Sequence, residues 1–245
     1  MRTICIINQK GGVGKTTTAI NLAAGLSRED KKVLLVDLDP QGNIDTSLKI
    51  KAEGDIYDAI IGNQVITQCI SNLAENLDVI TSKDSLQEAE IFIAEQGDPS
   101  VFIKNLFKGV NGYDFLIVDC PPSMGLLSQN ALHFCDEAFI PVSTDYLGFN
   151  GLKNMIGYIQ KTNQRKGNEI KISKIIPTLY DKRNKICKDT LAKIQTEFPQ
   201  LCSYPIHMNS KLKEAPKYGK SIFGYARSSR GAKDYSKLVE DTLAM

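Results

Sequence analysis

The residues best suited to chemistry form a short loop near the start of the chain, Asn8-Gln9-Lys10-Gly11-Gly12-Val13-Gly14-Lys15-Thr16-Thr17. An apolar, β-branched run precedes this loop, and a helical pattern over residues 17–26 follows it. Glycines let a backbone wrap around a phosphate, while the N–H groups and the helix N-terminus supply partial positive charge. The spacing G-x-x-x-x-G-K-[ST] is nearly met, with Lys10 in place of the first glycine. The loop therefore predicts a phosphate site in which Lys15 reaches the β- and γ-phosphates and Thr16 reaches Mg²⁺.

Aspartates follow two further apolar runs. The first run leads to Asp37 and Asp39, and the second, over residues 115–118, leads to Asp119. Phosphoryl transfer needs Mg²⁺ to bridge phosphate oxygens, a lysine to offset developing charge, and a group that orients water. We expect Thr16 and Asp119 to hold the metal, Asp119 through a coordinated water, and Asp39 to orient the attacking water. The alternative for Asp37 and Asp39 is that both carboxylates cap the turn that follows the strand.

Strands and helices must alternate to bring these residues together. Apolar runs bounded by turn residues predict strands over residues 3–7, 32–36, 77–80, 115–118, 138–142 and 170–176. Helical patterns cover residues 17–26, 85–94, 123–134, 147–165 and 184–198. This alternation predicts an α/β fold, a doubly wound and mostly parallel sheet with helices on both faces and the site at the strands' carboxyl ends. Residues 39–54 are polar enough to predict a mobile loop beside the nucleotide.

Length and composition narrow the class of protein. The 245 residues can bury one sizeable core, so we expect a single domain over residues 1–245. Six cysteines without a C-x-x-C pair, together with two histidines, argue against structural zinc and against a disulfide framework. No leader peptide opens the chain, and no apolar stretch approaches the roughly 18 residues of a membrane span. We therefore expect a cytoplasmic protein.

The charge is unevenly distributed along the chain. The net charge is +2, but residues 1–150 hold 11 Lys and Arg against 20 Asp and Glu, whereas residues 151–245 hold 19 against 8. Such asymmetry favours a basic face for a polyanion, since charge placement acts on partners rather than on the fold. The alternative is a solvated surface that happens to be basic.

Lys10, which stands in place of the first glycine of the motif, makes the phosphate loop resemble that of a known family. A lysine before the glycines, here Lys10, is typical of the deviant Walker A loop, and this loop resembles that of the ParA/MinD/nitrogenase-iron-protein family. In that family the extra lysine reaches the nucleotide of the partner subunit, which implies that Lys10 acts in trans and Lys15 in cis. The run that begins at Asp37 resembles the ParA signature D-x-D-P-Q-G-N, which implies a role for Asp39 in hydrolysis. The run that begins at Asp119 resembles its D-x-P-P-S.

Later segments extend the resemblance over residues 2–240 and separate ParA from MinD and the iron proteins. They are Pro177-Thr178-Leu179-Tyr180-Asp181-Lys182-Arg183, Met208-Asn209-Ser210-Lys211-Leu212-Lys213-Glu214-Ala215-Pro216 and Ser229-Arg230-Gly231-Ala232-Lys233-Asp234-Tyr235. The chain is thus identified as a small ParA/Soj-type P-loop ATPase without the separate N-terminal helix-turn-helix domain of the larger class. One departure is Lys211, which replaces the family's usual arginine and lacks its bidentate fork.

The resemblance implies a function. ATP with Mg²⁺ would join two subunits into a homodimer, the dimer would bind nucleoid DNA without sequence preference, and a ParB-like partner would stimulate slow hydrolysis. Lysines and arginines suffice for such phosphate contacts. The candidate DNA contacts are Arg183, Lys185, Lys211, Lys213, Lys217, Lys220, Arg227 and Arg230. By resemblance, the adenine contacts are Pro177, Met208 and Asn209.

Two rival classes share the phosphate loop. A MinD-like membrane cycler needs an amphipathic C-terminal helix, but residues 235–245 carry only a short apolar stripe and predict a helix packed on the body of the protein. An electron-transfer iron protein needs suitably spaced thiolates at a dimer axis, and Cys120 and Cys135 lack glycine-rich surroundings. The sequence is compatible with a chromosome, a plasmid or a protein assembly as the cargo.

Overall fold

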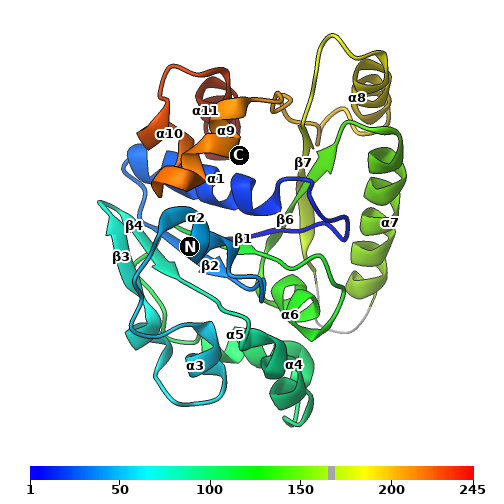
Figure 1. Cartoon of the computed structure of the whole chain (residues 1–245). Coiled ribbons are helices and arrows are strands. Elements are labelled where there is room, and N and C mark those ends of the chain that lie inside the picture. Colours follow the sequence, from blue (N-terminus) through cyan, green and yellow to red (C-terminus); the bar gives the residue numbers. More distant parts are fainter. Residues whose placement is uncertain (165–168) are drawn as a thin grey trace.

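The computed structural model describes residues 1–164 and 169–245, and within these residues seven strands form one sheet (Figure 1). The spatial order is β3-β4-β2-β5-β1-β6-β7. The strands are β1 (Arg2–Ile6), β2 (Val33–Asp37), β3 (Ser71–Ala74), β4 (Leu77–Ile80), β5 (Phe115–Asp119), β6 (Glu137–Ser143) and β7 (Lys171–Thr178). Every neighbouring pair is parallel except β3 with β4. The predicted doubly wound, mostly parallel sheet is confirmed.

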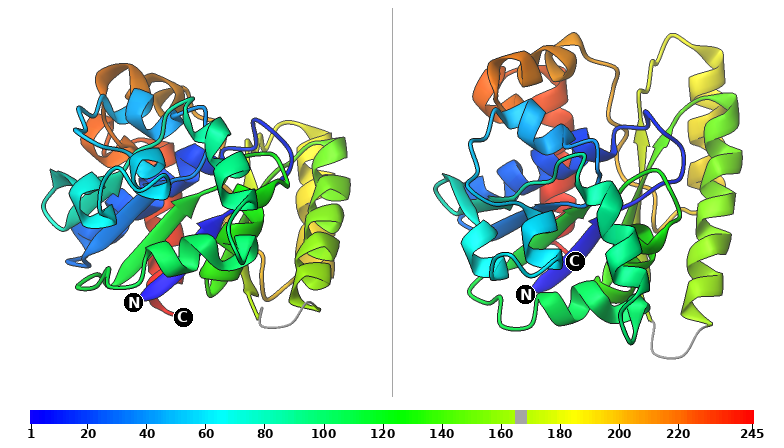
Figure 2. Two further views of the ribbon diagram at one scale, coloured as in Figure 1. Left: turned by 90° about the horizontal axis from the view of Figure 1, so that it is seen from below. Right: turned by 60° about the horizontal axis from the view of Figure 1, so that its bottom comes forward.

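Helices cover both faces of this sheet (Figures 1 and 2). They are α1 (Lys15–Arg28), α2 (Asn43–Leu48), α3 (Ile56–Ile60), α4 (Leu86–Ala94), α5 (Phe102–Leu106), α6 (Leu126–Phe134), α7 (Tyr146–Asn163), α8 (Lys185–Glu197), α9 (Ser210–Glu214), α10 (Ile222–Tyr225) and α11 (Arg230–Leu243). Three short 3₁₀ turns are η1 (Ile66–Cys69), η2 (Pro99–Val101) and η3 (Ala215–Tyr218). Successive strand residues point to opposite faces, so Ile4 and Ile6 enter the core beneath α1 and α11, while Cys5 enters the core beneath α3 to α7.

The expected strands lie within two residues of those observed, because strands buried on both faces read as continuous apolar runs. The sequence did not predict β3, a short antiparallel edge strand whose side chains alternate between half-buried and exposed. The expectation of a loop over residues 39–54 was wrong for residues 43–48, where helix α2 forms and buries Ile44 and Leu48. The helix expected over residues 147–165 is observed as α7, and its predicted last residue, Arg165, lies outside the described residues.

Helix α11, the last helix of the chain, packs along α1. Tyr235 is buried, and its hydroxyl lies 3.2 Å from the hydroxyl of Thr18 on α1. Gly25 allows the close approach of the two helices, since a Cβ there would overlap Val239. The guanidinium of Arg2 donates to the carbonyl of Thr242 at 2.7 Å, which places the two chain ends side by side (Figure 2). The apolar stripe of α11 is thus used in packing, as predicted. Among the described residues, no helix has the length and apolar character needed to cross a membrane.

Candidate functional site

A cavity of about 490 Å³ opens where α1 begins, beyond the carboxyl ends of β1 and β2. Its lining includes Lys15 and five of the seven predicted loop residues that flank it, together with Asp39 from the end of β2; these are Gly11, Gly12, Gly14, Lys15, Thr16, Thr17 and Asp39. Gly12 and Gly14 have φ of 72° and 90°, a left-handed conformation that a side chain would strain. Val13 between them is buried and anchors the loop to the core.

The cavity faces a helix N-terminus without a side-chain cap. Gly14 is the N-cap of α1 and can offer no side-chain oxygen to the first N–H groups of the helix. Lys15 is only 7% exposed and lines the same cavity. N–H groups, helix dipole and a largely buried ammonium therefore converge on one space, which is suited to a polyphosphate.

Asp119 at the end of β5 is fully buried, and neither of its carboxylate oxygens has a hydrogen-bond partner among the described residues. Burial and the neighbouring charge of Asp37 raise the pKa of Asp119 well above its usual range, while Thr16 and Lys15 oppose that shift. An unpaired buried carboxylate is costly unless a cation offsets it. Mg²⁺ commonly uses one or two carboxylates and completes its shell with water and substrate phosphates, so Asp119 with Thr16 fits this ion.

The structure gives different surroundings to Asp37 and Asp39, for which the sequence left open a role in hydrolysis or in capping the turn. Asp37 is fully buried and accepts hydrogen bonds from the backbone N–H groups of Asp39 (2.9 Å) and Ile44 (3.2 Å). Burial raises the pKa of Asp37 to about 7. It therefore caps the turn and the start of α2, as the alternative reading predicted. Asp39 also accepts from a turn N–H, that of Gln41, but it lines the cavity.

Lys10 points away from the cavity, and the lining taken over the described residues does not include it. Its ammonium lies 2.8 Å from both carboxylate oxygens of Asp145 and 3.0 Å from the hydroxyl of Ser143. Asp145 is the N-cap of α7 and also accepts from the N–H of Gly148. Although burial acts in the opposite direction, the contact with Lys10 lowers the pKa of Asp145. Lys10 is thus held at the outer side of the phosphate loop by its own chain.

The far side of the cavity is formed by residues that the sequence reasoning did not assign to the nucleotide. They come from α1, α2, α9, η3 and the turn after η3, and they include Ile20, Asn21, Asn43, Ser47, Leu212, Ala215, Pro216 and Lys220. The predicted adenine contacts do not line it: Pro177 is buried in β7, Met208 is exposed, and Asn209 caps α9. The segment around Leu212 carries part of the family resemblance, and only the fold brings it into the same cavity lining as α1.

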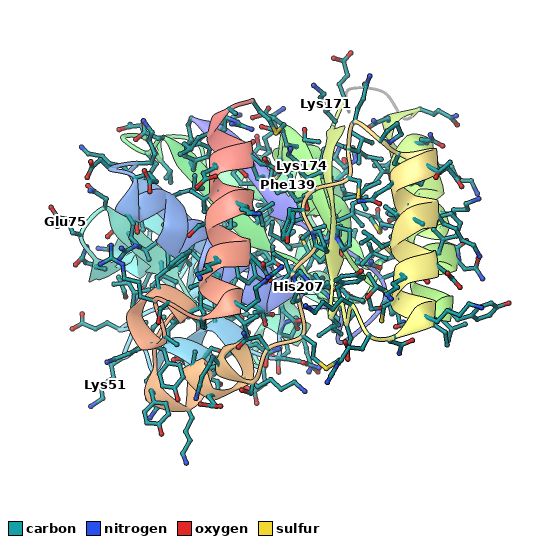
Figure 3. The ribbon with its side chains drawn as sticks, turned by 90° about the horizontal axis from the view of Figure 1, so that it is seen from above. Lys51, Glu75, Phe139, Lys171, Lys174 and His207 are labelled. Atoms are coloured by element: carbon teal, nitrogen blue, oxygen red, sulfur yellow. The ribbon has the colours of Figure 1, made fainter. Side chains whose placement is uncertain are left out.

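The predicted DNA contacts fall into separate groups. Arg183 and Arg230 line one hollow of about 380 Å³ beside His207, which lies between α11 and β7 (Figure 3). Lys211, Lys213 and Lys217 are exposed on α9 and η3. The remaining candidates are also exposed; they are Lys185, Lys220 and Arg227.

Several of these cations are already paired within the chain. The guanidinium of Arg183 makes two hydrogen bonds to Asp181, at 3.0 and 2.9 Å, and these contacts lower the pKa of Asp181 to about 2. Lys211 lies 2.7 Å from Glu214. Both pairs are exposed, so they are weak and can exchange for other anions.

Arg230 differs from these exposed pairs. Its Nε donates to the buried Asp234 at 2.9 Å, and its Nη2 donates to the hydroxyl of Tyr204 at 2.7 Å. His207 binds the second oxygen of Asp234 through its backbone N–H and its ring. The side chain of Arg230 is therefore fixed in place at the hollow.

Comparison with known proteins agrees with the fold and identifies the family. Residues 1–172 match the family model described as "AAA domain". The chain is 35% identical to the chromosome-partitioning ATPase Soj of Treponema pallidum, over 99% of this chain and 97% of that protein. It is 36% identical to the chromosome partitioning protein ParA of Myxococcus xanthus, over 99% and 88%. The solved structure of a putative plasmid partition protein from Borrelia burgdorferi, bound to AMPPNP, superposes with a TM-score of 0.85 at 25% identity, covering 99% and 98%. The chain is therefore an ATPase that belongs to the ParA/Soj family of partition proteins.

Proposed function

We propose that the protein is an ATP-gated DNA partition switch. Two subunits would enclose ATP between them, the dimer would bind DNA of any sequence, and a ParB-like partner would stimulate hydrolysis and release. The observation that carries this proposal is the division of the two loop lysines, since Lys15 lines the cavity while Lys10 is held outside it. A lysine beside a phosphate loop but outside its own cavity would reach a second nucleotide by leaving its partner Asp145.

The cavity supports a role for each of its residues. Lys15 would neutralise the β- and γ-phosphates, and the loop N–H groups would bind their oxygens. Thr16 and Asp119 would hold Mg²⁺, and the ion would offset the negative charge of the phosphates. Asp39 would orient the attacking water from the end of β2, and Lys10 would neutralise the γ-phosphate of the partner subunit's nucleotide.

Hydrolysis provides the first test. Asp39→Ala should bind ATP with little change in affinity, because Asp39 contributes no positive charge to the phosphates. Turnover should fall at least about tenfold, since a positioned proton acceptor typically contributes that much or more. The dimer should then persist in size-exclusion chromatography with ATP, while Asn72→Ala, an exposed substitution on the edge strand β3, serves as the control. An Asp39→Ala protein that hydrolyses ATP at the wild-type rate would remove Asp39 from the mechanism.

DNA contacts provide the second test. Non-specific binding neutralises phosphates and releases counterions, so log K falls with log salt by roughly 0.9 per phosphate contacted. Arg183→Ala and Lys211→Ala should each lower DNA affinity on all sequences and reduce this slope by about one per lost contact per subunit. ATP affinity should be unchanged. The measurement is fluorescence anisotropy over a salt series, with Lys104→Ala, an exposed lysine on α5, as the matched control. Unchanged salt slopes in both variants would show that the DNA-contact surface lies elsewhere on the protein.

A further inference from the structure

Thr178, the last residue of β7, joins three segments of the chain at one point. Its side chain is buried, and its hydroxyl donates to the carbonyl of Val13 at 2.7 Å. Its own carbonyl accepts two hydrogen bonds from Thr144, one from the backbone N–H at 3.1 Å and one from the hydroxyl at 3.2 Å. Buried hydrogen bonds of this kind fix relative positions, because breaking one leaves a polar group without a partner.

Both segments held by Thr178 belong to the nucleotide machinery. Val13 is the residue between the two glycines of the phosphate loop that have positive φ. Thr144 lies between Ser143 and Asp145, the two side chains that hold Lys10. Thr178 is therefore tied to the loop that would close on ATP and to the segment that Lys10 would leave when it reaches a partner's nucleotide.

The chain then runs directly into residues 180–183, called here the DNA-contact segment because it ends at the predicted DNA contact Arg183. Leu179 has φ of 53°, a left-handed conformation that is strained for a bulky residue. The backbone N–H of Tyr180 donates to the carbonyl of Ile206, and the backbone N–H of Met208 donates to the carbonyl of Tyr180. The carboxylate of Asp181 binds the guanidinium of Arg183. Only four residues lie between Thr178, whose hydroxyl binds the phosphate loop, and Arg183, whose guanidinium is expected to bind DNA.

We propose that Thr178 is the positioning residue that couples the nucleotide state to the DNA-contact segment. This inference rests on the proposed function and adds a route for its ATP dependence. In this proposal Thr178 moves when the Val13 carbonyl shifts on ATP binding, or when Thr144 shifts as Lys10 leaves Asp145. The strained Leu179 then transmits the displacement of Thr178 to Arg183. The coupling free energy would come from the difference in the hydrogen bonds of Thr178 between the ATP-bound and the ADP-bound state.

The test compares Thr178→Val with Thr178→Ser. Valine keeps the shape of threonine and removes the donor to Val13, whereas serine keeps the donor and removes the methyl group. We measure ATP affinity by calorimetry and DNA affinity by anisotropy with ATP and with ADP. For Thr178→Val the ratio of DNA affinities in ATP and ADP should fall about tenfold, within the usual range of couplings between sites. ATP affinity should change less than about threefold, and Thr178→Ser should keep the wild-type ratio.

A double variant identifies the route. If Thr178 acts through Arg183, Arg183→Ala should lower DNA affinity in ATP much less in the Thr178→Val background than in the wild type. A wild-type ratio in Thr178→Val, or full additivity with Arg183→Ala, overturns the inference and leaves the proposed function intact. Loss of ATP binding in Thr178→Val also overturns it, since Thr178 would then only support the phosphate loop. Nucleotide-independent DNA binding by the wild type would overturn the proposed function itself.

Discussion

Lys15→Ala should bind ATP about a hundredfold or more weakly than the wild type. The ammonium of Lys15 is largely buried at the head of α1, and truncating one partner of a buried charge pair costs about 2–5 kcal/mol. The remaining N–H groups of the loop carry only partial charges and cannot replace it. Calorimetric titration with ATP and Mg²⁺ measures the loss, with a thermal melt to show that the variant is folded. Lys104→Ala, which removes an exposed lysine of α5, is the control and should bind as the wild type does. Wild-type affinity in Lys15→Ala would exclude this cavity as the phosphate site.

Lys10→Ala should separate nucleotide binding from dimer formation. Lys10 lies outside its own cavity, so monomeric ATP affinity should stay within about threefold of the wild type, the scatter expected for a site whose contacts are unchanged. Dimerisation with a non-hydrolysable ATP analogue should be lost, because two nucleotides would face each other without the ammonium groups that Lys10 of each subunit would place between them. Sedimentation velocity measures the dimer.

Asp145→Asn is the matched control for Lys10→Ala. It loosens the pair that holds Lys10 but keeps Lys10 itself, so it should still dimerise with the analogue. The asparagine oxygen can still cap α7, which preserves the start of that helix. If Lys10→Ala and Lys15→Ala lose ATP affinity equally, the trans role of Lys10 is wrong.

The sequence predicted those parts of the fold and the site that depend on residues close together in the chain. The phosphate loop and the central strands could be found because each is a contiguous motif or a continuous apolar run. Helix α2 was missed because its apolar residues, Ile44 and Leu48, are two among polar neighbours, and they are buried only where the fold packs α2 against α1 and η3. The capping role of Asp37 depends on the start of α2, whose Ile44 N–H donates to its carboxylate.

Other features depend on segments that meet only in three dimensions. The far wall of the cavity joins Asn21 on α1 to Leu212 and Pro216, nearly two hundred positions later in the chain. Motif spacing carries no information about such a contact. The direction of the Lys10 side chain is set by Asp145, on a different strand-to-helix connection, and a loop motif alone does not reveal it.

The most direct test of the account is the DNA affinity of the wild-type protein in different nucleotide states. Fluorescence anisotropy with two labelled duplexes of unrelated sequence should be recorded with ATP and Mg²⁺, with ADP and Mg²⁺, and without nucleotide. We predict binding at least about tenfold tighter with ATP than with ADP, because dimerisation doubles the basic contacts on one surface and each contact adds to the counterion release. The two duplexes should bind equally and with the same salt slope. Equal affinity in all nucleotide states, or strong preference for one duplex, would contradict the account.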